Sequence, residues 1–189
     1  MENKWNRISF LLLVFIFSCE HFHGRLLDPK SLLPVPDLLG RWSVIQDGKE
    51  SSLVRISFNQ ETKTFLVEIE GEIDRSHLRF THIGGKTIGE YHDVSENGEE
   101  MDSGHIFLLQ KTESGWKVVL GSDISKQMVT KHNIVAKPHK SYGKNPPSYF
   151  LSGNREENTK ALVKLIHDPD FFQIENLKKV MFLQSLPNP

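Results

Sequence analysis

The sequence has little cysteine: Cys19 is the only one among 189 residues. A disulfide within the chain is therefore excluded, and the folded part must be held together by an apolar core. The spacings of a zinc site, a phosphate-binding loop and a Gly-x-Ser-x-Gly nucleophile elbow are also missing. We expect a binding protein rather than an enzyme, with no catalytic residues, no metal and no cofactor.

Long hydrophobic runs are missing too. The longest apolar run covers residues 8–17 and is interrupted only by Ser9. A bilayer-spanning helix needs roughly 20 apolar residues, so this run is too short to span. Lys4 and Arg7 precede it, and a positive start followed by a short apolar centre is typical of a secretory signal peptide.

Alanine does not occur before Ala136, so the usual small-x-small cleavage site has no candidate. Residues 16–19 read Ile-Phe-Ser-Cys and resemble a bacterial lipobox, in which the cysteine is acylated before cleavage. The resemblance implies a lipoprotein signal peptide at residues 1–18, a lipid attachment site at Cys19 and a bacterial cell envelope protein held by its acyl chains. Ordinary secretion with cleavage after Ser18 is the alternative.

Charge of one sign does not dominate the chain. Its 23 basic and 24 acidic residues are interspersed and give a formal net charge of −1. A nucleic-acid-binding domain usually carries a basic patch or stripe, so we expect no nucleic-acid partner. The acyl chains predicted at Cys19 make the membrane a predicted partner.

The remainder divides into three parts. Residues 19–37 contain three prolines and no sustained period, which predicts a tether that holds the folded part off the membrane. Residues 38–151 contain short alternating apolar runs separated by turn signals. We expect strands at residues 41–46, 53–59, 64–70, 77–83, 86–92, 105–111, 116–121 and 127–135.

Strands joined in sequence order by hairpin-length connections predict a mainly β fold, an up-and-down antiparallel meander of eight to nine strands. Closure into a barrel removes the exposed edges, and a two-sheet sandwich is the alternative. Residues 152–189 are predicted to hold a C-terminal α-helix and a tail. Asn154 and Glu157 have the spacing of a capping box, and residues 173–189 fit a helix or a strand.

Gly40-Arg41-Trp42 resembles the Gly-x-Trp motif that opens the first strand of lipocalins. The chain as a whole is similar to small bacterial lipoproteins with a lipocalin-like, calycin-type β-barrel. This resemblance implies that the indole of Trp42 closes one end of the barrel. Lipocalins pack an arginine on that indole, whereas this chain would have to use Lys131 or Lys137.

The period of two places Phe58, Phe65 and Phe80 on the inner face of their strands, with His82 on the same side. We expect these four residues to contact a ligand in the barrel. An eight-stranded barrel has just enough interior either to hold one small ligand or to be filled by side chains. A hollow barrel would carry a small hydrophobic molecule. A filled barrel would be an interaction module that binds another envelope or host protein.

Overall fold

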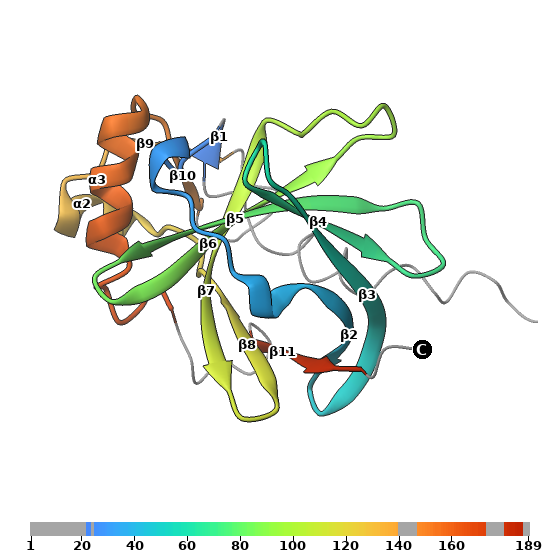
Figure 1. Cartoon of the computed structure of the whole chain (residues 1–189). Coiled ribbons are helices and arrows are strands. Elements are labelled where there is room, and N and C mark those ends of the chain that lie inside the picture. Colours follow the sequence, from blue (N-terminus) through green and yellow to red (C-terminus); the bar gives the residue numbers. More distant parts are fainter. Residues whose placement is uncertain (1–21, 24, 140–146, 173–179, 187–189) are drawn as a thin grey trace, which may run out of the picture.

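The fold is a closed antiparallel β-barrel with a smaller helical lobe on one side (Figure 1). The computed structural model describes residues 22–23, 25–139, 147–172 and 180–186. Every neighbouring pair of barrel strands is antiparallel, and pairing of β6 with β7 closes the ring. The eight strands are β2 (Gly40–Gln46), β3 (Lys49–Asn59), β4 (Thr64–Ile69), β5 (Arg75–Ile83), β6 (Lys86–Val94), β7 (Ser103–Thr112), β8 (Gly115–Leu120) and β11 (Val180–Ser185). The predicted fold class is therefore confirmed.

The eighth strand comes from the C-terminal tail. Strand β11 lies between β8 and β2 and pairs with both, for example through Leu183, which lies opposite Trp116 and Val44. Residues 180–185 belong to the tail for which the sequence left helix and strand open. They complete the barrel because β8 and β2 would otherwise each leave an unpaired edge.

The strand predicted at residues 127–135 is wrong, because this segment forms helix α2 (Lys126–His132). Ser125 caps the helix by accepting a hydrogen bond from the backbone N–H of Met128, and Asn133 ends it in the left-handed conformation at φ +49°. Met128 and Ile134 are buried in the apolar core between the helical lobe and the barrel, whereas the residues between them are more exposed. Capping and one-sided burial outweigh the β-branched content of this segment.

The segment that we expected to be a tether packs against the barrel in its described part. It contains strand β1 (Phe22–His23) and two 3-10 turns, η2 (Pro29–Ser31) and η3 (Pro36–Leu38). Five apolar side chains along residues 22–38 are almost fully buried: Phe22, Leu26, Leu27, Leu32 and Leu38. Prolines interrupt regular secondary structure but do not prevent a segment from packing. Burial of these apolar side chains holds the segment against the barrel.

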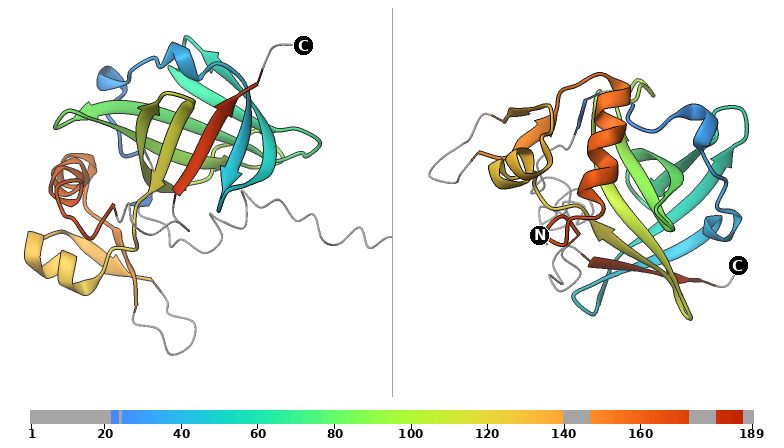
Figure 2. Two further views of the ribbon diagram at one scale, coloured as in Figure 1. Left: turned by 90° about the horizontal axis from the view of Figure 1, so that it is seen from below. Right: turned by 90° about the vertical axis from the view of Figure 1, so that its left-hand side faces the viewer.

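The protein has two apolar cores. The first lies inside the barrel, and the second lies between the outside of β6, β7 and β8 and the helical lobe. The lobe consists of α2, α3 (Arg155–Leu165), β9 (Ala136–Pro138) and β10 (Tyr149–Leu151), and Figure 2 shows it projecting beyond the barrel. Leu162 and Leu165 of α3 are fully buried in the second core. None of the described helices is long and apolar enough to cross a bilayer.

The capping box is present at the start of α3. The side chain of Asn154 accepts from the backbone N–H of Glu157, and the Glu157 carboxylate accepts from the backbone N–H of Asn154. Two of the orphan donors of this helix end are thereby satisfied.

We predict that a chain ending at residue 179 loses its cooperative thermal unfolding transition. Removal of β11 leaves the edges of β2 and β8 unpaired. It also removes Met181 from the barrel core and exposes the residues that Met181 contacts there. Circular dichroism with heating measures the transition, and a chain ending at residue 186 is the control that should unfold like the complete protein. A cooperative transition in the shorter chain would show that seven strands suffice.

Candidate functional site

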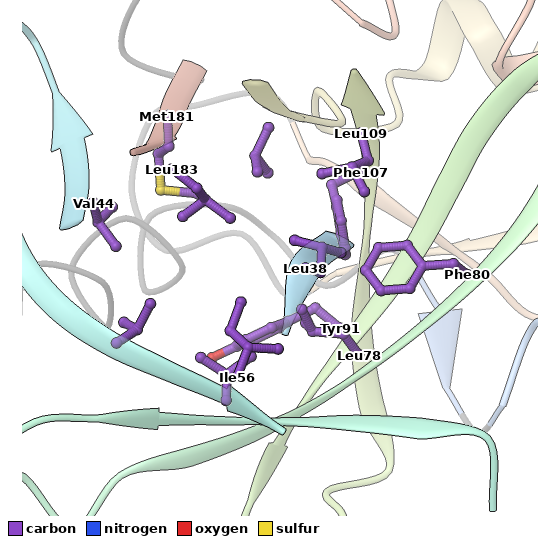
Figure 3. A pocket seen from close by; sticks show the side chains of 13 residues that line it. Leu38, Val44, Ile56, Leu78, Phe80, Tyr91, Phe107, Leu109, Met181 and Leu183 are labelled. Carbon is purple, nitrogen blue, oxygen red and sulfur yellow. The ribbon is translucent and has the colours of Figure 1, made fainter. Parts of the chain in front are cut away.

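A cavity of about 70 Å³ lies inside the barrel (Figure 3). All eight strands and η3 contribute to its wall, and the atoms that face it are apolar. The 13 lining residues are Leu38, Val44, Val54, Ile56, Val67, Leu78, Phe80, Tyr91, Phe107, Leu109, Val118, Met181 and Leu183. The barrel is thus neither tightly filled nor widely hollow.

Turn η3 is held across one end of the barrel by two tryptophans. The indole N–H of Trp42 donates to the carbonyl of Leu38 at 2.8 Å, and that of Trp116 donates to the carbonyl of Asp37 at 3.3 Å. Lys111 forms an ion pair with Asp37 and lies 5.7 Å from the ring centre of Trp116. These contacts hold Leu38 at one end of the cavity, where its side chain forms part of the wall.

Lys131, one of the two lysines considered as the partner of Trp42, forms an ion pair with the buried Asp168 in the lobe at 2.9 Å. Lys137 lies in β9 of the same lobe. The lysine beside a barrel tryptophan is Lys111, and it lies over Trp116.

The three predicted phenylalanines form one chain of ring contacts. Ring centres lie 4.6 Å apart for Phe58 and Phe65, 5.2 Å for Phe65 and Phe80, and 5.6 Å for Phe80 and Phe107. Only Phe80 of the three lines the cavity. Phe65 is buried behind it, and Phe58 is half-buried beside a separate depression of about 640 Å³ at the β3–β4 turn.

His82 does not point into the barrel. It is exposed, and its ring nitrogen Nδ1 lies 3.2 Å from the hydroxyl oxygen of Thr87. The period of two assigned it to the inner face, but it is the second-last residue of β5, where the strand reaches the rim. Cys19 lies outside the described residues, so its lipidation stays a prediction.

The prediction from the sequence did not include the part of the cavity wall that β6, β7, β8 and β11 form. Tyr91, Phe107 and Leu109 are inward residues of strands that are buried on both faces, so no alternation of apolar and polar residues marked them. Gly89 offers one signal in retrospect. A Cβ on this residue would lie 2.1 Å from the Phe107 ring, so glycine leaves the space that the ring occupies.

Tyr91 contributes its ring to the cavity, while its hydroxyl is engaged at the barrel end. The hydroxyl of Ser76 donates to the Tyr91 oxygen at 2.9 Å, and the Tyr91 hydroxyl donates to the Asp93 carboxylate. Burial, together with the negative charge of Asp93, raises the pKa of Tyr91 well above its usual range. The phenol therefore stays neutral, and the atoms that face the cavity are all apolar.

A buried charged cluster lies on the outer face of β5 and β6. Glu90 is fully buried, and one carboxylate oxygen accepts the backbone N–H groups of Leu26 and Leu27 at 3.0 and 2.9 Å. Arg79 donates to the other oxygen at 3.4 Å. Burial raises the pKa of Glu90, although the two backbone hydrogen bonds oppose that shift. Glu90 therefore holds the N-terminal segment against the barrel.

Glu100 completes this cluster. Arg79 donates to both of its carboxylate oxygens, and His77 Nδ1 lies 3.1 Å from one of them. Burial alone would raise the pKa of Glu100, but the hydrogen bonds from His77 and Arg79 outweigh it and hold this pKa well below its usual range. His92 is also buried, and its Nε2 lies 3.9 Å from Glu90. Among the described residues no group of three or more potential ligands is arranged to hold a metal ion.

Comparisons of the chain with models of known families, with curated proteins and with solved structures give no match.

We predict that Glu100→Gln lowers the free energy of unfolding at neutral pH by on the order of 3 kcal/mol, because the buried Arg79 loses its closer charged partner and retains the 3.4 Å contact with Glu90. A carboxyl whose pKa is lowered by folding stabilises the fold above its unfolded pKa, near 4.5, and this stabilisation is lost as the pH falls below that value. Urea unfolding at a series of pH values from neutral to acidic measures the free energy of unfolding of the unchanged protein and of the Glu100→Gln variant. Their stabilities should converge in acid, and a constant difference would contradict this role of the charge.

Proposed function

We propose that this protein binds a slender hydrophobic molecule inside its β-barrel. The observation that carries the proposal is the cavity with an apolar wall drawn from all eight strands. Burial of hydrocarbon in such a wall releases about 25 cal/mol for each Å² removed from water, and no polar group in the wall opposes it.

The size of the cavity limits the ligand. A cavity of about 150 Å³ accommodates benzene, and sites for drug-sized ligands measure about 300 to 1,000 Å³. At about 70 Å³, this cavity excludes bulky or ring-shaped molecules in its present form. An unbranched hydrocarbon chain fits because part of it can remain outside. Met181 in the wall is unbranched and adaptable, and its side chain can move to admit more of the chain.

A series of straight-chain fatty acids tests the ligand class. Each methylene that enters the cavity should contribute about 0.8 kcal/mol, which is close to a fourfold gain in affinity, and the gain should stop once the cavity is full. Titration calorimetry measures the affinities. Val54→Leu adds a methylene to a buried wall residue and should shorten the chain length at which the gain stops. Val163→Leu makes the same change at a half-exposed position of α3 and is the control.

Absence of binding at every chain length would favour the second candidate, a filled barrel that acts as an interaction module for another envelope or host protein. The small volume of the cavity is the observation that favours it. In that case Val54→Leu should change stability alone.

We also propose that the protein is an envelope lipoprotein anchored through Cys19. Its support is the Ile-Phe-Ser-Cys sequence after the short apolar run. Two or three acyl chains anchor a protein stably, whereas one does not.

Cys19→Ser should move the protein from the membrane fraction to the soluble fraction and abolish incorporation of labelled palmitate. Ser18→Ala keeps a small residue before the cysteine and should preserve both properties. Continued palmitate labelling of the Cys19→Ser protein would overturn the assigned attachment site.

A further inference from the structure

The charge of this chain is distributed unevenly in one region. Residues 124–155 contain five lysines and one arginine and no acidic residue, so all 24 acidic residues lie elsewhere. The described parts of this stretch, residues 124–139 and 147–155, form α2, β9, β10, their connections and the first residue of α3, and they carry Lys126, Lys131, Lys137 and Arg155. We call these described parts the basic lobe.

The basic lobe adjoins the start of the described chain. Phe22 of β1 pairs with Leu151 of β10, and β10 pairs with β9 through Phe150 opposite Lys137. Cys19 lies three residues before Phe22. Three residues span at most about 10 Å even when fully extended. Acyl chains on Cys19 would therefore hold the basic lobe at the membrane surface.

Two cations of the basic lobe are available to a partner. Lys126 and Lys137 are exposed, and neither forms an ion pair with any described residue. Lys131 differs because it is paired with Asp168. Val135 is 51% exposed, and its carbonyl accepts from the backbone N–H of Ser152, which continues the extended pairing of β9. Val135 and Lys137 are two residues apart in this extended chain and so point to the same side.

We propose that the basic lobe is a contact surface for anionic lipid headgroups. The proposal rests on the acyl anchor at Cys19 only for the proximity of the lobe to the bilayer. Lysines near an anionic membrane surface contribute about 1 kcal/mol each, or close to a fivefold change in the contact equilibrium. An acyl anchor combined with a basic surface is a recurrent way to achieve stable membrane attachment. The exposed Val135 side chain adds an apolar contact at the same place.

The geometry has a consequence for orientation. Since the described chain begins packed against the barrel, only residues 19–21 separate the anchor from the folded body. The barrel should therefore be held with the basic lobe toward the bilayer. The β7–β8 turn lies away from the lobe in both Figure 1 and Figure 2 and should remain in water.

The experiment uses the complete acylated protein in vesicles, with one cysteine introduced at Val135→Cys and labelled with a spin label. Glu113→Cys in the exposed β7–β8 turn is the matched control. Collision with oxygen and with a water-soluble nickel complex reports lipid contact. The label at residue 135 should contact lipid in vesicles that contain phosphatidylglycerol, and contact should weaken in phosphatidylcholine alone or in high salt. The label at residue 113 should stay in water throughout.

Lys126→Gln and Lys137→Gln should each reduce the contact equilibrium at residue 135 about fivefold. Lys49→Gln and Lys63→Gln remove the same charge from exposed positions on the barrel and should have no such effect. Equal contact in neutral and anionic vesicles, or equal effects of the two pairs, would overturn the basic lobe as a headgroup surface.

The N-terminal peptide mass shows separately whether Cys19 is acylated. An unacylated chain whose residue 135 still contacts anionic vesicles would overturn the anchor and support the surface. An acylated chain without this contact would overturn the surface alone.

Discussion

The outer edges of β2 and β8 are paired by one strand, β11, and the rest of the architecture follows from that pairing. Strand β8 ends at Leu120 and β11 begins only at Val180, so the chain leaves the barrel, builds the helical lobe and then returns. The lobe packs on the outside of β6, β7 and β8, which is why these strands are buried on both faces. The return of the chain as β11, the second core and the burial of β6, β7 and β8 on both faces thus all result from the same excursion of the chain between β8 and β11.

Two kinds of force hold the N-terminal segment to this body. Leu26 and Leu27 bury their side chains in the second core while their backbone N–H groups bind the Glu90 carboxylate. A fully buried carboxylate is costly unless its charge and lone pairs are satisfied. Arg79 supplies the countercharge, and Glu100 in turn neutralises Arg79. Because the Glu90 carboxylate needs these partners, it fixes the position of Leu26 and Leu27 on the barrel. The same N-terminal segment continues to Leu38 at the cavity.

The sequence predicted the parts that have one wet side. Strands β3, β4 and β5 alternate apolar and polar residues, and their positions and inward faces follow from that period. The capping residues Asn154 and Glu157 gave the start of α3 for a similar local reason. Period alone failed where strands end, as at His82, and where a helix has β-branched residues, as in α2. The charged cluster joins residues more than 60 positions apart, which no local pattern can reveal.

The packed N-terminal segment also makes the molecule a mechanical linkage. A force applied through the proposed anchor at Cys19 would enter the described structure at Phe22, pass the two hydrogen bonds to Glu90 and reach Leu38, which forms part of the cavity wall. Since Leu38 is seated by Trp42, tension on the chain acts directly on the support of the cavity. The hydrogen bonds from Leu26 and Leu27 to Glu90 lie between these two points and would resist the force after the pairing of β1 with β7 and β10. The proposed membrane attachment and the cavity wall are therefore linked through the N-terminal segment.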